Sequence, residues 1–381
     1  MDYDIAVAGA GPAGSTAAYI LSKKGYNVLL IDKENFPRKK LCGGCLTLKT
    51  LQLLNEIFNE PEHALTQKNI IDFKSHRFEI RYKTEILVNK PSAYPFYFVD
   101  RSIYDDFLFQ KAKKAGTNVI PGEKITGVNS EKNELITVNN RLIKAKFIIA
   151  ADGANSTLRA KLLRQKKLKA PFWQRNMAYC LETFPGRNQY ASAIDYPILS
   201  FGYLRYGYAW IFPNKERVVV GMGGLNRKNK HLTGKFNTFL SDYHLNTLDS
   251  LETRGHPLPF GSFIPKPLCP GGNILLIGDA AGLVDPILGE GIYQAQKSGE
   301  LAAQAIIEKF ENNKDPESNF LNLLRTHLLH EIIYARKYRW FLYNNINHIL
   351  KYRSIKWAAT FFDKLVELGH GDRSYQRLKK K

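Results

Sequence analysis

A glycine-rich turn near the start of the chain is the strongest constraint on the fold. The segment DYDIAVAGAGPAGSTAAYIL, residues 2–21, holds Gly9, Gly11 and Gly14 in G-x-G-x-x-G spacing. The residues before the turn read as a short buried strand and those after it as a helix. A second apolar run, NVLLI, follows at residues 27–31 and reads as another buried strand. The pattern predicts a β–α–β unit that opens an α/β fold.

Each glycine of this turn has a separate expected role. Gly9 permits a tight turn, Gly11 lets a pyrophosphate approach the backbone, and Gly14 allows close packing of the helix on the strand. The helix N-terminus supplies N–H donors to an anion. Asp32 follows the second strand, where a carboxylate can accept the ribose hydroxyls of a dinucleotide. The predicted cofactor-binding residues of this unit are Gly9, Gly11, Pro12, Ala13, Gly14, Asp32 and Lys33.

NAD and FAD both use this turn, and a second segment decides between them. NILLIGDAAGLVDPILGEGIYQA, residues 273–295, places Asp279 directly after a buried strand and small residues before a helix that begins near Ile292. It resembles the second flavin motif of the glutathione-reductase and hydroxylase-like flavoproteins. The resemblance implies FAD, with Asp279 on the ribitol and the helix start facing the isoalloxazine ring, where its dipole would stabilise negative charge. The implied cofactor-binding residues are Asp279, Pro286, Gly289, Gly291 and Ile292.

Two weaker motifs lie between these segments. FIIAADGANSTLR carries Asp152 and resembles the Asp-Gly motif of the hydroxylase branch, and VDRSIYDDFLFQKA resembles that branch's arginine-containing helix start, with Arg101 near the FAD. By the same resemblance, Ile125 is assigned to the cofactor site. Each segment alone reads equally well as a strand end or a solvated helix, but their order along the chain supports the flavoprotein interpretation.

Three features together resemble the geranylgeranyl reductase family from the start of the chain to about residue 310. They are the basic loop FPRKKLCGGCLT at residues 36–47, the Tyr-x-Trp-x-Phe-Pro signature within residues 205–223, and GDAAG followed by Pro286 and GEGI. The resemblance implies an FAD-dependent oxidoreductase that transfers hydride from reduced flavin to carbon–carbon double bonds of a polyprenyl lipid. It also implies a Rossmann-like, three-layer ββα FAD domain with an antiparallel-sheet substrate domain and a C-terminal helical region.

The resemblance assigns catalytic roles to Cys42, Tyr208 and Trp210. Cys42 is expected near flavin and substrate, and Gly43 would let the backbone pass close to the flavin. The family loop commonly reads Cys-Gly-Gly-Gly, whereas this chain has Cys45 in the last position. The added thiol is either an inert small residue or a redox partner of Cys42, and the sequence leaves both open.

Aromatic residues are expected to form the substrate pocket, because their faces stabilise positive charge on a reacting alkene. Aromatic residues also favour strands, so part of this set is expected to belong to the core of the sheet. The predicted substrate-binding residues are Phe201, Tyr203, Tyr208, Trp210 and Phe212.

The FAD-binding domain is predicted to be discontinuous, because its strand-like runs are far apart in the chain. Residues 175–222 read as a mostly antiparallel sheet, and the chain has helical periodicity from Gly291 almost to its end, with the second stretch running from Leu321 to about Leu368. The predicted parts are an FAD-binding domain at 1–75, 98–165 and 268–310, a substrate domain at 76–97 and 166–267, and a basic helical region at 311–381.

The chain is basic, with 55 Lys and Arg against 35 Asp and Glu and a formal net charge of +20. From Tyr334 to Lys381 there are 12 Lys or Arg against 3 Asp or Glu, interleaved with aromatic residues. Such a helix suits the surface of an anionic membrane, but a helix that covers the back of an enzyme is nearly as good an explanation. No nucleic-acid recognition module is expected.

The remaining expectations concern compartment and partners. Four cysteines and the lack of an export signal favour the cytoplasm, with peripheral contact at the inner face of the membrane, and no transmembrane segment or metal site is expected. No second dinucleotide fold is visible, so the electron donor, NADPH, NADH or a ferredoxin-like protein, would dock from outside. The alternatives are a flavin-dependent monooxygenase or halogenase of the same fold, a thiol–disulfide flavoenzyme and a flavin-bearing binding protein without turnover.

Overall fold

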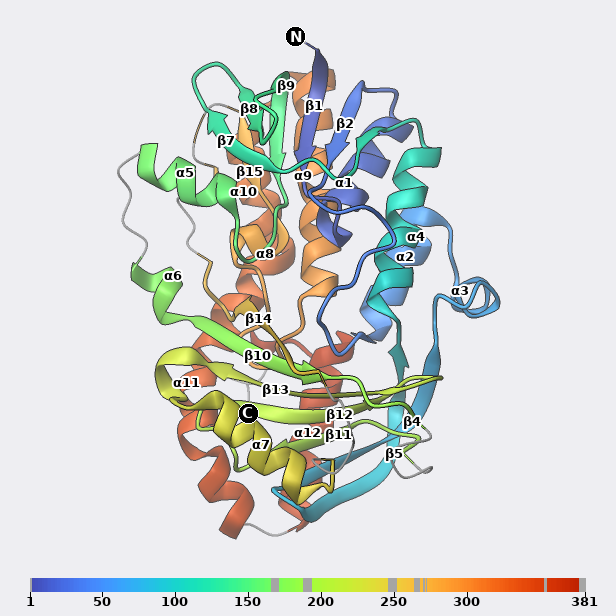
Figure 1. Cartoon of the computed structure of the whole chain (residues 1–381), viewed down its shortest axis with the longest axis vertical. Helices are drawn as coiled ribbons and strands as arrows, with labels where there is room; N and C mark the ends of the chain where they lie inside the picture. Colours follow the sequence, from blue (N-terminus) through green and yellow to red (C-terminus); the bar gives the residue numbers. More distant parts are fainter. Residues whose placement is uncertain are drawn as a thin grey trace.

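Two β-sheets form the framework of the protein (Figure 1). The computed structural model describes residues 2–165, 171–187, 194–245, 252–263, 268–269, 271, 273–352 and 355–376. The first sheet has strand order β6-β2-β1-β9-β8-β7, with β15 also beside β9, and the second has order β14-β10-β13-β12-β11-β4-β5-β3. The mixed α/β fold predicted from the sequence is confirmed.

The first sheet is parallel where the dinucleotide motif lies. Its parallel strands are β6 (Asn118–Ile120), β2 (Val28–Ile31), β1 (Tyr3–Ala8), β9 (Leu142–Ala150) and β15 (Ile274–Leu276). Strands β8 (Glu134–Thr137) and β7 (Ile125–Asn129) continue from β9 in antiparallel pairing. The apolar residues of β2 are all fully buried, as expected for a parallel sheet covered on both faces.

Two long-range neighbours, α1 (Pro12–Lys23) and α9 (Ile292–Asn312), pack side by side against the first sheet. A Cβ atom on Gly299 of α9 would lie 2.3 Å from the carbonyl oxygen of Ala13, so only glycine allows the two helices to come this close. Helix α4 (Arg101–Lys114) packs on α1, and α2 (Leu48–Phe58) packs on α9. The α1–α9 contact joins segments that are far apart in the sequence.

The second sheet is antiparallel except between β4 and β11, which are parallel. The mostly antiparallel sheet predicted between Arg175 and Met222 is confirmed, with the addition of three N-terminal strands and of β14, which lies beyond this range. The strands are β3 (Cys45–Leu46), β4 (Phe73–Tyr82), β5 (Glu85–Phe98), β10 (Met177–Thr183), β11 (Ile198–Phe201), β12 (Gly207–Pro213), β13 (Val218–Leu225) and β14 (Arg254–Pro259). The residue ranges of the three parts stay a prediction.

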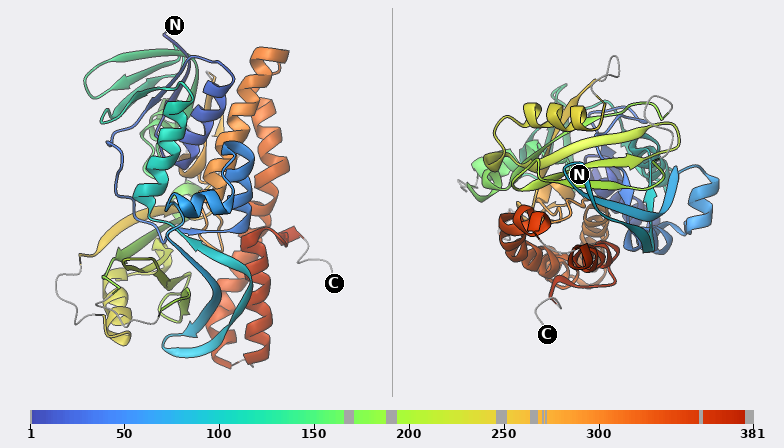
Figure 2. Two further views of the ribbon diagram at one scale, coloured as in Figure 1. Left: turned by 90° about the vertical axis from the view of Figure 1, so that its right-hand side faces the viewer. Right: turned by 90° about the horizontal axis from the view of Figure 1, so that it is seen from below.

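The C-terminal helices lie against one face of the second sheet and α7 (Leu232–Asp242) lies against the other (Figure 2). The helical stretch predicted from Leu321 to about Leu368 is divided into α10 (Pro316–Leu324), a π-helical turn (Arg325–Leu329), α11 (His330–Tyr352) and α12 (Ile355–His370). Helix α12 packs on β5 and α11 on β4. Among the described residues, no helix is both long and apolar enough to cross a bilayer.

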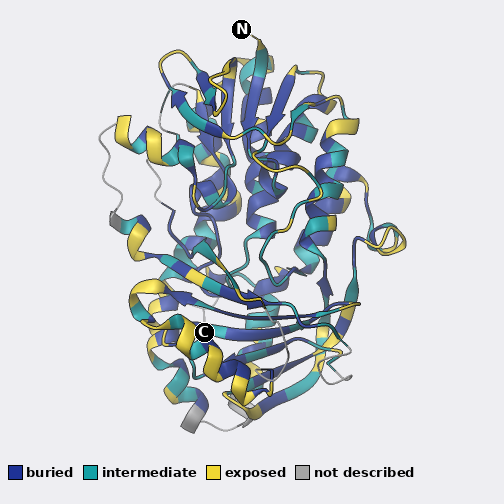
Figure 3. Cartoon of the chain, viewed as in Figure 1, coloured by how far each residue is buried: buried dark blue, intermediate teal, exposed yellow. Residues whose placement is uncertain are grey.

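Short helices complete the connections between the larger elements. They are α3 (Glu62–Gln67), α5 (Thr157–Gln165), α6 (Pro171–Arg175), the 3₁₀ turn Asn226–Lys228, and α8 (Gly278–Ala281). Helix α5 packs on β7, and α8 lies directly before the segment that leads to α9. Buried residues fill the regions between these elements and the sheets (Figure 3).

The close α1–α9 contact predicts that Gly299→Ala destabilises the protein by about 1–3 kcal/mol, because the methyl group must push two helices apart. Gly234→Ala is the matched control, since Gly234 also lies in a helix and a Cβ there would meet no atom within 4 Å. The control is expected to be neutral or stabilising by up to about 1 kcal/mol. Denaturant unfolding of both variants measures the difference, and equal stability of the two would contradict it.

Candidate active site

In the glycine turn between β1 and α1, Gly9 and Gly14 have no room for a side chain, whereas Gly11 has room. Gly9 has φ +103°, and a Cβ there would lie 2.3 Å from the carbonyl oxygen of Ala151; one on Gly14 would lie 1.9 Å from that of Gly9. A Cβ on Gly11, in contrast, would meet only Nη2 of Arg38, at 3.5 Å. The open backbone at Gly11, at the N-terminus of α1, fits a pyrophosphate group.

Asp32 lies beside this turn, at the end of β2. Its Oδ2 accepts the N–H of Ala10 at 2.6 Å and its Oδ1 accepts that of Glu34 at 2.9 Å. Each carboxylate oxygen has a second lone pair, so Asp32 can still accept the hydroxyls of a ribose. The neighbouring Lys33 is exposed and lies 3.7 Å from Glu34.

The two other predicted cofactor residues of the first sheet have internal partners. Asp152, after β9, accepts the hydroxyl of Ser156 at 2.5 Å and the N–H of Leu158 at 3.0 Å, so it fixes the start of α5. Burial raises the pKa of Asp152. Ile125 begins β7, pairs with Thr137 and is buried in the core of the first sheet. Their contacts with the cofactor stay predictions.

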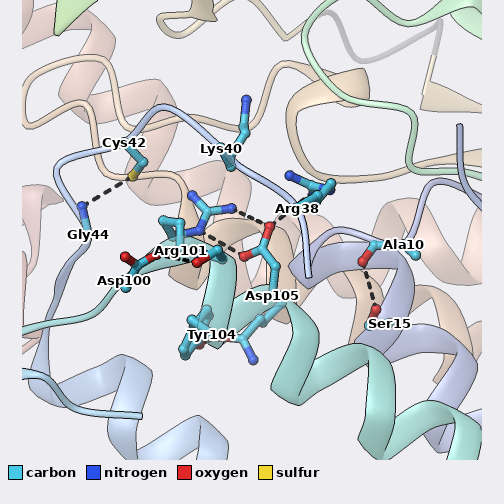
Figure 4. Close-up of polar contacts among 12 residues, drawn as sticks. Ala10, Ser15, Arg38, Lys40, Cys42, Gly44, Asp100, Arg101, Tyr104 and Asp105 are labelled. Atoms are coloured by element: carbon cyan, nitrogen blue, oxygen red, sulfur yellow. Dashed lines mark hydrogen bonds and ion pairs between the residues drawn. The ribbon is translucent and has the colours of Figure 1, made fainter. Parts of the chain in front are cut away.

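A buried ion-pair network connects the basic loop to α4 (Figure 4). Arg101 donates from Nε and Nη2 to the two carboxylate oxygens of Asp105, at 2.8 and 3.0 Å, and Nη2 of Arg38 lies 3.0 Å from Asp105 Oδ2. Figure 4 shows the network between the Cys42 loop and the start of α1, where Ser15 donates to Ala10. Asp105 therefore holds two guanidinium groups between the two segments expected to flank the FAD.

The loop Cys42–Gly44 passes the end of the second sheet at close range. A Cβ on Gly43 would lie 2.7 Å from the ring of Phe212, and one on Gly44, with φ +68°, would lie 2.2 Å from the carbonyl oxygen of Val99. The Gly44 N–H donates to Sγ of Cys42 at 3.4 Å. Cys45 lies in β3, and burial raises the pKa of its thiol, which favours the inert interpretation over a redox partner of Cys42.

The second flavin motif forms the turn from β15 through α8 to α9. The carboxylate of Asp285 accepts the N–H groups of Ile287 and Leu288 at 2.8 and 2.7 Å, which shapes the loop before Gly291 at the N-cap of α9. Gly289 has φ +70° and Pro286 packs against Gly261. None of the hydrogen bonds described for the chain involves the carboxylate of Asp279, so this group is available to a ligand. Burial raises its pKa, and Lys40 and Arg101 oppose that shift.

An apolar cavity of about 280 Å³ lies between the second sheet, the Cys42 loop, the start of α9 and the two C-terminal helices. It brings together four of the five predicted substrate residues with the Cys42 loop and the start of α9, the two segments predicted to lie beside the flavin ring. The predicted residues on its wall are Cys42, Gly43, Phe201, Tyr208, Trp210, Phe212, Gly289, Gly291 and Ile292. The hydroxyl of Tyr208 donates to the carbonyl oxygen of Leu288, which connects β12 to the loop before α9.

Tyr203 does not line this cavity, so its predicted substrate role is not supported. Its hydroxyl donates to Asp242 Oδ2 at 2.7 Å, and its ring lies 5.3 Å from that of Phe239. It lies two residues after Phe201, the last residue of β11, and packs on the α7 side of the sheet. The aromatic composition of the segment predicted a pocket. Which side of the sheet an aromatic ring lies on depends, however, on where the strand ends.

The sequence interpretation missed a polar wall of the cavity and its helical cover. Glu182 and Cys180 of β10 line the cavity with His256 of β14, whose Nε2 contacts Nζ of Lys40. A charged residue within the apolar run AYCLETF was the available signal for Glu182. The helical cover consists of Leu342, Tyr343 and Ile346 of α11 and Phe362, Leu365, Val366 and His370 of α12.

Burial sets the charge state of this polar wall. It raises the pKa of Glu182 to about 7, although Lys40, Arg101 and Arg217 oppose the shift. Burial also lowers the pKa of His256 to about 3, with the positive charge of Lys40 acting in the same direction. At neutral pH His256 is therefore uncharged and can accept a hydrogen bond from Lys40, while Glu182 is divided between its acid and its carboxylate.

Residues 2–177 match the family model described as "FAD binding domain". The chain is 30% identical over 341 residues to a geranylgeranyl diphosphate reductase of Synechocystis. The alignment covers 81% of this chain and 76% of that protein. It is 30% identical over 330 residues to a menaquinone reductase of Mycobacterium tuberculosis, covering 80% and 76%. The chain belongs to the geranylgeranyl reductase family of FAD-dependent oxidoreductases.

Solved structures agree on the fold. A geranylgeranyl bacteriochlorophyll reductase-like protein of Thermoplasma acidophilum matches with a TM-score of 0.76 and 24% identity over 97% of this chain and 91% of that one. The halogenase PltM in complex with phloroglucinol and FAD matches with a TM-score of 0.69 and 19% identity, over 99% and 85%. The cofactor of this family member is FAD, which supplies hydride chemistry when reduced. The open backbone at Gly11 and the available carboxylate of Asp279 fit its pyrophosphate and ribitol.

The two kinds of glycine in the turn predict opposite effects. Gly11→Ala is expected to leave stability unchanged, because its Cβ enters open space, but to raise the Kd for FAD about tenfold or more, equivalent to at least about 1.4 kcal/mol. Gly9→Ala is expected to cost about 1–3 kcal/mol of stability through backbone strain. Thermal unfolding of the apoproteins and FAD titration separate the two, and a Gly11→Ala variant with wild-type affinity would contradict the assignment.

Proposed function

We propose that the protein reduces carbon–carbon double bonds of a polyprenyl lipid, with reduced FAD as the hydride source. The observation that carries this proposal is the cavity itself, whose wall is almost entirely apolar and aromatic and which reaches the Cys42 loop and the start of α9. A long methyl-branched hydrocarbon chain matches such a wall, because burial of its methyl and methylene groups supplies the binding energy. Relatives whose names specify geranylgeranyl substrates support the same class.

The protein's own contribution is to exclude water, hold the alkene and stabilise positive charge that develops on it. Trp210 and Tyr208 line the cavity with ring centroids 5.9 Å apart, and Phe212 lies next to Trp210. Each aromatic face stabilises a nearby cation by about 0.5–2 kcal/mol. Cys42, with its thiol in the loop that borders the cavity, completes the proposed catalytic set.

The flavin must first be reduced by an external donor, either by a hydride from a nicotinamide nucleotide or by two single electrons from a ferredoxin-like protein together with protons from solvent. NADPH, NADH and a ferredoxin-like protein are the proposed candidates, and each would dock transiently. The basic character of the chain favours any of the three, because the nucleotides carry phosphate groups and ferredoxin-like proteins are commonly acidic.

Anaerobic single turnover tests the reaction. Enzyme reduced with dithionite is mixed with geranylgeranyl diphosphate without oxygen, and the visible flavin absorbance is expected to return while mass spectrometry detects two added hydrogens per reduced bond. The fully saturated diphosphate serves as control and should leave the flavin reduced. Reoxidation that requires oxygen would instead indicate a monooxygenase or halogenase.

We also propose that α11 contacts an anionic membrane. Along this helix the exposed residues form one stripe, Lys337, Trp340, Phe341, Asn344 and His348, while Leu342, Tyr343 and Ile346 on the opposite side line the cavity. Trp340 and Phe341 are 67% and 60% exposed, which is unusual for large apolar side chains. A basic helix with an exposed aromatic stripe suits the membrane interface, where a prenyl lipid would enter. The proposed location of the enzyme is therefore the inner face of the membrane.

The membrane proposal predicts that the double variant Trp340→Ser, Phe341→Ser binds anionic liposomes at least about tenfold more weakly, because two apolar side chains no longer enter the interface. Ile103→Ser is the matched control, since Ile103 is also exposed, at 45%, but lies on α4. Sedimentation with phosphatidylserine vesicles at low salt measures binding. Equal binding by the double variant and the control would remove the proposed contact.

A further inference from the structure

Alkene reduction requires a proton as well as a hydride, and the cavity contains a buried carboxyl group that the reaction so far leaves unused. Glu182 lies in β10 and is only 3% exposed. It lines the cavity together with Cys180, two residues earlier on the same face of the strand. His256 lies on the same wall, but most of the other residues that line the cavity are aromatic or aliphatic. Burial of a carboxyl group in such a position costs free energy, which indicates a functional role.

One carboxyl oxygen of Glu182 has no hydrogen-bond partner among the described residues. The backbone N–H of Cys42 donates to the Glu182 carboxyl, which ties it to the loop that borders the cavity. Its Oε2 is buried and has no hydrogen-bond partner among the described residues. Trp210 Nε1 is likewise buried without a partner, and its ring covers Gly221, the residue that pairs with Glu182 on the neighbouring strand. Both polar groups are therefore available to whatever occupies the cavity.

We propose that Glu182 is the proton donor of the reduction and transfers its carboxyl proton to the alkene carbon that does not receive the hydride. This role rests on the proposed function. The π bond breaks, one carbon takes the hydride that reduced FAD supplies, and the other takes the proton as the O–H bond of Glu182 breaks. The alkene gains two electrons and the flavin loses two. Glu182 is left as a carboxylate, which regains its proton from water.

The surroundings of Glu182 suit both halves of this cycle. Burial keeps a large share of the group in the acid form near neutral pH, since its pKa is raised to about 7. After the transfer, nearby positive charges stabilise the carboxylate. The titratable or charged groups that face Glu182 from the Cys42 loop, α4, its own strand and the adjacent strands are Lys40, Arg101, Cys180, Arg217, Arg254 and His256.

The first test measures protonation without turnover. Infrared difference spectra of the oxidised holoenzyme are recorded across a pH titration. A protonated carboxyl band is expected to disappear as pH rises through about 7, and to be absent in Glu182→Gln. Glu134→Gln is the control, because Glu134 is also buried, at 8%, but lies in β8 of the other sheet. A band that persists in Glu182→Gln, or the lack of any band near neutral pH, would overturn the proposal.

The second test measures the chemical step. Reoxidation of the reduced enzyme by the prenyl substrate is expected to slow about 10²- to 10⁴-fold in Glu182→Gln, the range typical for loss of a general acid. Reoxidation by ferricyanide, which needs no proton on carbon, should keep its wild-type rate and shows that the variant still holds FAD. Glu182→Asp is expected to retain part of the prenyl rate.

The pH dependence separates failure of this proposal from failure of the proposed function. Because only the acid form donates, the wild-type prenyl rate should fall as pH rises through about 7. Wild-type enzyme that never reduces a prenyl acceptor would refute the function, while the infrared titration would still decide the protonation of Glu182. Prenyl reduction that proceeds at equal rate in Glu182→Gln, or a wild-type rate independent of pH in this range, would refute the proton donor alone.

Discussion

The carboxyl edge of the parallel sheet is the constraint on which the rest of the site depends. The turn after β1 carries Gly9 to Gly14, β2 ends before Asp32, β9 before Asp152, and β15 before Asp279. Parallel strands all end at the same edge, so four segments from distant parts of the chain meet there. Helices α1 and α9 follow two of these segments and pack closely against each other, and the bare backbone at Gly299 permits that contact.

The second sheet uses its two faces for different purposes. Against α7 it forms a closed core in which Phe236 and Phe239 are fully buried. Against α11 and α12 it forms a looser layer, and the cavity lies within it. Because the C-terminal helices make one wall, the cavity depends on α11 and α12. The two faces of these helices therefore differ. Apolar residues of α11 and α12 face the cavity, while Trp340 and Phe341 of α11 face outward.

The sequence could predict those parts of the site that depend on local backbone geometry. The glycine turn and Asp32 each need a particular residue at a particular place in a strand–turn–helix unit, so their spacing indicated a dinucleotide. FAD and the family came from the resemblance of residues 273–295 and of the other motifs to known flavoproteins. Tyr203 shows the limit of this reasoning. Whether a strand residue faces the cavity or the α7 core depends on strand ends and pairing register, which the order of residues does not reveal.

Glu182 and the C-terminal helices escaped prediction for a related reason, since their importance comes from what packs beside them. Glu182 looks ordinary within β10. It becomes distinctive because the Cys42 loop, far away in the sequence, lies beside it and the backbone N–H of Cys42 donates to its carboxyl group. A loop fixed to α4 by the Arg38–Asp105–Arg101 network thus sets the electrostatic environment of a carboxyl group on a different sheet. The same loop is expected to border the flavin, so hydride source and proton source would be positioned by a single segment, and the relative placement of the two would not depend on motion between the sheets.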